Sequence, residues 1–261
     1  MRILILVSSY RKHGNTARLV ELISAEMQAE AERLGETLEL ETLHMAHMDI
    51  QPCRGCRACF DRGEAKCPVR DDIPVIKRKI ESADGLLLAS PVYVEDVNGV
   101  MKTWIDRMAY VCHRPDFAGK CIYLVVTSGT TATRHSLDTM SLAMRTWGGY
   151  LCGQASFKMG ALMPLEEIKS RFQDQASRIA RMLLESTRRN KALDPSILSL
   201  MIFQVQKGVW GKAADGSFDY NYWKEKGWLE PGTKFYIPIR SSQLKIWLAQ
   251  GLGALVGLFY R

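Results

Sequence analysis

The fold is decided by residues 2–34, RILILVSSYRKHGNTARLVELISAEMQAEAERL. The run RILILVS (2–8) is short and rich in β-branched and aliphatic residues, which is typical of a buried strand. A polar loop follows, and from Thr16 to Leu34 apolar residues recur at close to helical spacing. This stretch therefore predicts a strand, a loop and a helix in immediate succession.

The alternation of strand and helix continues to about residue 190. Strand alternating with helix five times predicts a parallel sheet that is covered by helices on both faces. Five strands at this spacing suit the flavodoxin-like order 2-1-3-4-5. The later strands are expected at LELETL (38–43), GLLLAS (85–90), CIYLVVTS (121–128) and YLCGQASF (150–157), and the later helices near 72–83, 100–108, 134–147 and 165–190.

The composition of the chain changes after Arg189. The segment DYNYWKEKGWLEPG (219–232) is rich in aromatic and turn residues, and the chain ends in an apolar run from Ile246 to Tyr260. That run is too short for an ordinary membrane-spanning helix. We expect a flavodoxin-like domain over residues 1–190 with a cysteine-rich loop at 52–72, and an aromatic-rich helical extension over 191–261.

The chain carries a net charge of +7 with a pI near 9.0. This charge would suit anionic partners, and equally a merely basic surface. It is not accompanied by a usual RNA- or DNA-binding signature, so no nucleic-acid partner is expected. The apolar run from Ile3 to Val7 is too short for a signal peptide, and no small-residue cleavage site follows it. We therefore expect a cytoplasmic, reducing location, where clustered cysteines indicate a metal or catalysis rather than disulfides.

Three loops should meet at one edge of the sheet, because open parallel sheets bind ligands beyond the carboxyl ends of their strands. These loops are SSYRKHGNT (8–16), SPVYVEDVNG (90–99) and TSGTTATR (127–134). The first leads into a helix N-terminus, where unpaired backbone N–H groups and the helix dipole favour a phosphate. The alternative is that Asn15 or Thr16 simply caps the helix.

The other two loops carry an aromatic ring and small hydroxyl residues. Pro91 and Tyr93 could offer a stiff turn and a stacking face to a planar ring system, although a lone tyrosine is more often a packing residue. Thr127, Ser128 and Gly129 add hydroxyls and allow a close backbone approach, or form an ordinary strand-to-helix turn. The three loops together indicate a binding site that none of them indicates alone.

Four of the seven cysteines lie in the run PCRGCRACFDRGEAKCP (52–68), with the spacing C-x2-C-x2-C-x7-C-P. Three thiolates at every third residue can wrap one face of a compact cubane, and a fourth can close its opposite corner. A zinc site would more naturally show two C-x2–4-C pairs. The spacing favours a [4Fe–4S] cluster, with free or redox thiols and zinc left as alternatives. The candidate ligands are Cys53, Cys56, Cys59 and Cys67.

The blocks SSYRKHGNT, the cysteine run ending in RDD, and ASPVYVEDVNGVMKTWIDR (89–107) occur in this order over about residues 1–160. In this respect the chain resembles the NAD(P)H-dependent FMN reductase group of flavodoxin-fold proteins, and most closely its iron–sulfur flavoprotein branch. Members of that group usually read Gly-Ser-Pro-Arg where this chain has Ser8, Ser9, Tyr10 and Arg11. This chain therefore has a serine where the group has a flexible glycine, so the resemblance does not predict the backbone path of its first loop at this position.

The resemblance implies that FMN is bound at the meeting point of the three loops. It implies a phosphate site in the first loop, a ring site on the second, and a far side closed by the third. The residues concerned are Ser9, Arg11, Asn15 and Thr16 for the phosphate, Pro91, Val92 and Tyr93 for the ring, and Thr127, Ser128 and Gly129 for the far side.

The function implied is an oxidoreductase in which FMN takes electrons from NAD(P)H and passes them to a small-molecule or protein acceptor. The alternative is a flavin and iron–sulfur electron carrier without substrate chemistry of its own. No side chain is identified as a catalytic acid or base, and Asp106 and Arg107 are expected to take part in helix packing near the site. We also expect a homo-oligomer, because Gly253 and Gly257 have a G-x-x-x-G spacing that favours a dimer contact over peripheral membrane attachment.

Overall fold

The structure is a computed structural model that describes residues 1–129, 133–189, 193–213 and 216–257. Residues 130–132 of the third predicted loop lie outside the described residues. The same is true of the predicted domain boundary at 190 and of the last part of the C-terminal apolar run.

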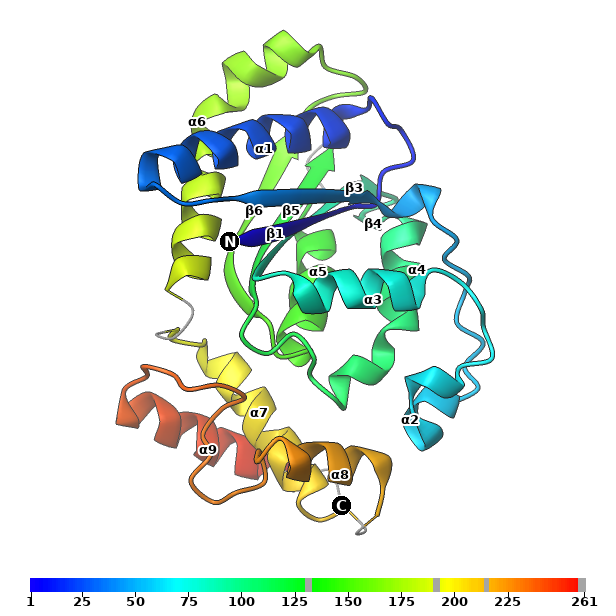
Figure 1. Cartoon of the computed structure of the whole chain (residues 1–261), viewed down its shortest axis with the longest axis vertical. Helices are drawn as coiled ribbons and strands as arrows, with labels where there is room; N and C mark the ends of the chain where they lie inside the picture. The colour runs from blue at the N-terminus through cyan, green and yellow to red at the C-terminus, as the bar shows by residue number, and fades with distance from the viewer. Residues whose placement is uncertain (130–132, 190–192, 214–215, 258–261) are drawn as a thin grey trace.

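Within the described residues, five parallel strands form the central sheet in the order β2-β1-β3-β5-β6 (Figure 1). When the parallel strands alone are numbered along the chain, this is the predicted order 2-1-3-4-5, and the flavodoxin-like fold class is confirmed. The sequence did not predict β4, a two-residue strand that pairs antiparallel with the end of β3. The strands are β1 (Arg2–Val7), β2 (Glu39–His44), β3 (Gly85–Tyr93), β4 (Asp96–Val97), β5 (Cys121–Ser128) and β6 (Tyr150–Lys158).

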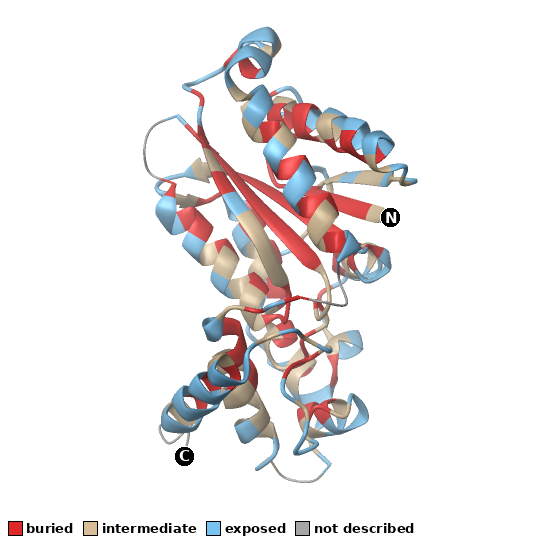
Figure 2. Ribbon diagram, turned by 90° about the vertical axis from the view of Figure 1, so that its left-hand side faces the viewer, coloured by how far each residue is buried: buried red, intermediate tan, exposed pale blue. Residues whose placement is uncertain are grey.

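Helices cover both faces of the sheet; its inner strands β1, β3 and β5 are mostly buried, whereas the edge strands β2 and β6 are mostly intermediate or exposed (Figure 2). One face carries α1 (Asn15–Leu34) and α6 (Leu165–Arg188). The other carries α3 (Ile73–Ser82), α4 (Gly99–Arg107) and α5 (Arg134–Thr146). Successive residues of β1 enter the two cores in turn, which is why that strand is an unbroken apolar run in the sequence.

The C-terminal extension is helical, as predicted, and lies beyond the amino ends of the strands, at the foot of Figure 1. Its aromatic residues pack into a core separate from the two cores of the sheet. We propose on this basis that residues 191–261 form a second structural unit. The remaining elements are η1 (Met45–His47), α2 (Ala58–Arg62), η2 (Glu64–Lys66), η3 (Ala109–Cys112), α7 (Ile197–Trp210), α8 (Phe218–Glu225) and α9 (Gln243–Gly257).

Truncation of Phe203 is expected to test this second core. The ring is fully buried on α7, and its centroid lies 5.7 Å from that of Trp223 and 4.8 Å from that of Tyr236. Because Phe203→Ala leaves a cavity among these rings, we expect the free energy of unfolding to fall by about 3–5 kcal/mol. The measurement is urea denaturation followed by tryptophan fluorescence. Leu142→Ala on α5, where the side chain is 58% exposed, should change the free energy of unfolding by less than about 0.5 kcal/mol.

Candidate functional site

The ten residues predicted for the flavin site line one cavity of about 220 Å³ beyond the carboxyl ends of the strands. The structure thus brings all three predicted loops together, as far as their described residues show. Three further lining residues were not predicted: Gly14 precedes α1, and Gly160 and Ala161 follow β6. The rule that ligands bind beyond the carboxyl ends of the strands could have pointed to the last two, because β6 ends at this same edge.

The N-terminus of α1 opens into this cavity without a side-chain cap from the described residues. Gly14 is the N-cap residue, and a Cβ there would come within 2.8 Å of the Arg11 Cβ, so the turn requires glycine. The backbone N–H of Arg11 donates to the Ser9 hydroxyl at 3.2 Å, which fixes the loop before the helix. The open amides and the dipole of a 20-residue helix make this end a site for an anion.

The alternative that Asn15 or Thr16 caps the helix is wrong. The Asn15 side-chain amide donates to the Gly160 carbonyl at 3.3 Å, and its oxygen accepts from the backbone N–H of Met163 at 2.8 Å. The Thr16 hydroxyl lies 2.7 Å from the Thr127 hydroxyl. Both side chains therefore join loops across the cavity, which the spacing along the sequence could not show.

The second loop is a tight hairpin between β3 and β4. Val94 and Glu95 form its two-residue turn with φ of 49° and 67°, a left-handed backbone that non-glycine residues adopt at a cost of about 1 kcal/mol or more each. Tyr93, directly before the turn, is 45% exposed and lines the cavity. The turn thus holds the Tyr93 ring at the rim of the cavity, although the backbone conformation of Val94 and Glu95 is one that these residues do not favour.

Asn98 connects this hairpin to the first loop and was not identified from the sequence. It is fully buried; its side-chain amide donates to the Ser8 carbonyl at 2.7 Å, and its side-chain oxygen accepts from the backbone N–H of Met101 at 3.3 Å, capping α4. The available signal was an asparagine directly before a predicted helix, which indicates a cap but not the second bond.

The four cysteines of the predicted cluster line a second cavity, of about 410 Å³. Cys53 and Cys56 are exposed, whereas Cys59 and Cys67 are half-buried, and all four are free thiols. Burial raises the pKa of the Cys59 thiol. Left-handed residues at Gly55 and Arg57 turn the backbone between the first three cysteines, and this turning brings thiols of an irregular segment to one cavity.

Hydrogen bonds hold the two ends of the cysteine loop together. The Arg107 guanidinium, expected only to pack, is buried and donates to the Asp71 carboxylate, to the Gln51 carbonyl at 2.9 Å and to the Cys67 sulfur at 3.8 Å. Asp71 also accepts from the backbone N–H of Gln51 at 3.0 Å. The two ends of the loop are therefore joined beside a cysteine, whereas Asp106 forms an exposed ion pair with Lys102 on α4.

The cysteine cavity differs from a site for a single ion. In the described parts of the chain, no group of three or more His, Cys, Asp or Glu side chains could hold one metal ion. A cubane cluster keeps its four cysteine sulfurs further apart than one zinc ion does, and it takes thiolate ligands that nearby N–H donors stabilise. Four thiols around one cavity, with a guanidinium at Cys67, are residues that could hold such a cluster.

His113 lies between the cysteine loop and the C-terminal extension. Its ring centroid is 4.6 Å from that of Phe60 and 4.7 Å from that of Trp210. The ring nitrogen Nδ1 lies 2.7 Å from the Asp219 carboxylate. Burial lowers the pKa of His113, but the bonds to Asp219 and Cys112 outweigh this effect and raise the pKa to about 9.

The stability of the protein is therefore expected to depend on the charge of His113. Its pKa in the folded protein is above its ordinary value of about 6.5, so the stabilisation is complete below pH 6.5 and is lost as the pH rises through 9. We expect the advantage of the wild type over His113→Gln to fall by about 2 kcal/mol between pH 6.5 and pH 9.5, allowing for solvent screening. Urea denaturation of both proteins at the two pH values measures this difference. Equal losses in the two proteins would contradict it.

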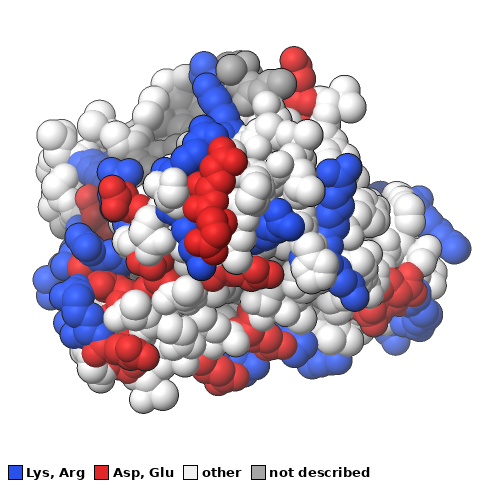
Figure 3. All heavy atoms as spheres, turned by 90° about the horizontal axis from the view of Figure 1, so that it is seen from above, with Lys and Arg blue, Asp and Glu red and all other residues white. Residues whose placement is uncertain are grey.

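The face over the carboxyl ends of the strands does not carry a patch of one charge. Figure 3, seen from above, shows Lys and Arg next to Asp and Glu over this face. On α6, Arg171 forms an ion pair with Glu167 at 3.3 Å. The net positive charge of the chain is therefore not concentrated around this edge of the sheet.

Comparison with known proteins agrees with the fold. Residues 1–160 match the family described as NADPH-dependent FMN reductase. The chain is 30% identical over 233 residues to an iron–sulfur flavoprotein of Archaeoglobus fulgidus, covering 86% of this chain and 98% of that protein. It is 37% identical over 107 residues to an iron–sulfur flavoprotein of Methanocaldococcus jannaschii, covering 41% of this chain and 51% of that one. A solved flavone reductase aligns with a TM-score of 0.52 at 14% identity, over 72% of this chain and 63% of that one, which supports the fold alone.

The fold and the family match define the class of the protein as a flavodoxin-like oxidoreductase that uses FMN. More particularly, the chain belongs to the NADPH-dependent FMN reductase family, as the resemblance in the sequence predicted.

Proposed function

We propose that this protein is an NAD(P)H-dependent FMN oxidoreductase that carries a [4Fe–4S] cluster and passes electrons to a small-molecule or protein acceptor. The observation that carries the proposal is the convergence of the three loops, residue by residue, on one cavity at the uncapped N-terminus of α1. When bound, FMN supplies the chemistry, because it accepts a hydride and releases electrons singly or in pairs. The protein contributes binding and orientation.

The first loop would bind the FMN phosphate mainly through its backbone. The side chains of Asn15 and Thr16 already bond to other loops, so we infer that their backbone N–H groups face the anion. The Ser9 hydroxyl and the exposed Arg11 would complete the phosphate site. Tyr93 would stack on the ring system.

The cluster is proposed for the cavity lined by Cys53, Cys56, Cys59 and Cys67. The names of the two iron–sulfur flavoproteins to which the chain is similar support this assignment. A cluster with four thiolate ligands carries net negative charge, and cationic side chains around the cavity would stabilise that charge. These side chains are Arg54, Arg57, Arg70, Lys77, Arg78 and Arg107.

One observation favours the electron carrier as a second candidate. Cys53 and Cys56 are exposed, so the cysteine cavity lies where a protein partner could approach it. Such a carrier would exchange electrons with that partner and would not react with a nicotinamide. The two candidates therefore differ in their response to NAD(P)H.

Anaerobic reduction tests the proposal. FMN-loaded protein is mixed with excess NADH or NADPH, and the flavin absorbance is followed before dithionite is added. We expect NADH or NADPH to bleach the flavin absorbance. We also expect the protein to oxidise the nicotinamide continuously when ferricyanide is present as the acceptor. Bleaching by dithionite alone would favour the carrier and overturn the reductase.

The homo-oligomer is proposed on the exposed face of α9. Leu244, Trp247, Leu248, Leu252 and Leu255 are exposed and recur at helical spacing, and the C-terminal helix shows this exposed outer side in Figure 2. The opposite side packs within the chain, since a Cβ on Gly253 would lie 2.7 Å from the Gln204 Cβ. A dimer contact through α9 would therefore use the large side chains rather than Gly253, the first of the two predicted glycines.

Charged residues on that face are expected to separate the copies. Leu248→Lys together with Leu252→Lys should lower the mass measured by light scattering to that of one chain, because two buried cations would oppose the contact. Glu225→Lys on α8 is the control. No described helix is long and apolar enough to cross a membrane, so vesicle binding by the unmodified protein would indicate surface attachment and contradict the dimer contact.

A further inference from the structure

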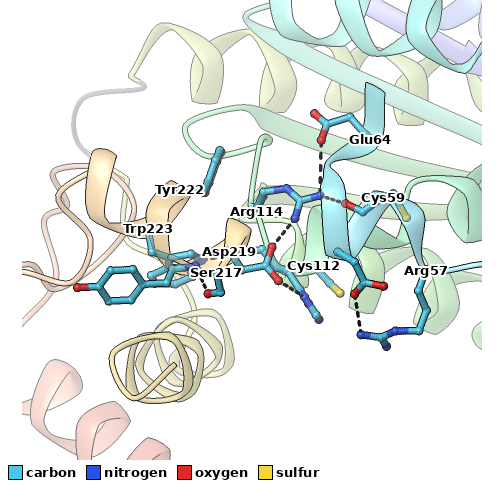
Figure 4. Close-up of polar contacts among 12 residues, drawn as sticks. Arg57, Cys59, Glu64, Cys112, Arg114, Ser217, Asp219, Tyr222 and Trp223 are labelled. Atoms are coloured by element: carbon cyan, nitrogen blue, oxygen red, sulfur yellow. Dashed lines mark hydrogen bonds and ion pairs between the residues drawn. The ribbon is translucent and has the colours of Figure 1, made fainter. Parts of the chain in front are cut away.

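The C-terminal extension reaches back onto the cysteine loop. Figure 4 shows α8 facing α2 and η2 across Arg114. The Phe218 ring lies against Gly63, between Cys59 and Cys67, where a Cβ would come within 2.8 Å of the ring. Gly63 has a φ of 90°, so its backbone also requires glycine. The middle of the cysteine loop is thus in direct contact with a residue more than 150 positions later in the chain.

Arg114 is the centre of this contact. The side chain is 1% exposed. Its guanidinium donates to the Asp219 carboxylate on α8 and to the Cys59 carbonyl at 2.6 Å (Figure 4). The same guanidinium lies 3.5 Å from the Glu64 carboxylate. The guanidinium carbon also lies 4.8 Å from the centroid of the Phe218 ring. One buried cation therefore joins a cysteine, η2 and the C-terminal extension.

The side of α8 that faces Arg114 is fixed by further bonds. The Tyr222 hydroxyl donates to Asp116 at 2.7 Å, and the Trp223 indole donates to the His113 carbonyl at 2.6 Å. Asp219, Tyr222 and Trp223 recur at helical spacing, so a single face of α8 makes all these contacts. The Ser217 hydroxyl caps the helix by accepting from the backbone N–H of Tyr220 at 3.2 Å. The Asp219 carboxylate is thereby held rigidly in front of Arg114.

Removal of the Asp219 carboxylate would take away the closer partner of the buried Arg114 guanidinium and leave it the longer contact to Glu64 at 3.5 Å. A broken buried pair is strongly destabilising, because the remaining ion cannot regain its hydration. The ends of the cysteine loop would still be joined through Arg107 and Asp71. Its middle, where Arg114 holds the Cys59 carbonyl, would be released.

We propose that Arg114 and Asp219 are positioning residues through which the C-terminal extension holds the cysteine loop in the arrangement that brings Cys53, Cys56, Cys59 and Cys67 to one cavity. This inference rests on the proposed function for its link to the cluster. The positioning itself is a property of the metal-free protein. It gives the C-terminal extension a role beyond its own packing, at a cavity separate from the one proposed for FMN.

The test compares Asp219→Asn with Glu225→Gln in the full-length protein. Both changes remove one carboxylate from α8, but Glu225 is exposed and lies at the last position of the helix, six residues after Asp219. Hydrogen exchange of residues 53–67 is measured in metal-free protein, and iron, sulfide and FMN are assayed after anaerobic reconstitution. For Asp219→Asn we expect exchange at least tenfold faster and less than half of the wild-type iron, with unchanged FMN. Asp219→Glu should restore part of the iron, whereas Glu225→Gln should match the wild type.

Phe218→Ala provides a milder variant in case Asp219→Asn unfolds the extension. It removes the ring from Gly63 and leaves the buried ion pair in place, so exchange of residues 53–67 should rise by about threefold or more. Wild-type exchange in both Asp219→Asn and Phe218→Ala would overturn the inference. If the unmodified protein takes up no iron, the proposed cluster is contradicted. The hydrogen-exchange result still tests whether Arg114 and Asp219 position the cysteine loop.

Discussion

Replacement of Cys67 by serine is expected to lower the iron content from about four per chain to less than one, while FMN remains bound. The hydroxyl of serine is a poor ligand for iron in place of a thiolate, and a cubane that loses one of four protein ligands is readily degraded. The FMN content should persist because the three flavin loops do not include Cys67. The measurement is an iron, sulfide and flavin assay on protein purified and reconstituted without oxygen.

Cys152→Ser is the matched control for this experiment. The Cys152 thiol lies on β6, donates to the Ile122 carbonyl at 3.3 Å, and does not line the cysteine cavity. Burial raises its pKa, which keeps it a neutral thiol rather than a metal-binding thiolate. Iron should therefore stay near the wild-type value. An unchanged iron content in Cys67→Ser would remove Cys67 from the ligand set, and zinc in place of iron in the wild type would replace the cluster altogether.

The fold could be predicted because its signals are local. The strand at 2–8 and the helix from Thr16 are recognisable from short-range periodicity, and the parallel order follows from their alternation. The hairpin at Val94 and Glu95 was missed because neither residue is of the Asn-Gly type that marks such turns. Its left-handed backbone closes the antiparallel pairing of β3 with β4, and neither valine nor glutamate signals such a backbone in the sequence.

The candidate sites likewise combine features that the sequence predicts with features that it does not. The loops that line the flavin cavity could be named because each follows a recognisable strand. The side-chain roles of Asn15 and Thr16 could not, since their partners lie more than 100 residues away. Arg114 and Asp219 gave no signal for the same reason: each is an ordinary charged residue until the C-terminal extension is folded against the cysteine loop.

Introduction of a carboxylate at Ser9 is expected to weaken FMN binding by about 100-fold or more. Ser9 is buried beside the open N-terminus of α1, where its hydroxyl lines the cavity proposed for the phosphate. An aspartate there would place its own negative charge at the N-terminus of α1, where it would take the place of the phosphate. The same charge would repel the phosphate. A 100-fold loss corresponds to about 2.8 kcal/mol of binding free energy. Flavin fluorescence titration of the apoprotein measures it.

Riboflavin distinguishes this cause from general damage to the site, because it has the same ring system and no phosphate. Its affinity should change by less than about fivefold in Ser9→Asp, since the ring would contact the second and third loops rather than the first. Ser170→Asp, an exposed position on α6, makes the same change of charge and should leave both affinities within twofold. Equal losses for FMN and riboflavin in Ser9→Asp would mean that the phosphate does not lie at the N-terminus of α1. The whole orientation proposed for the flavin, with its ring toward Tyr93, would then have to be abandoned.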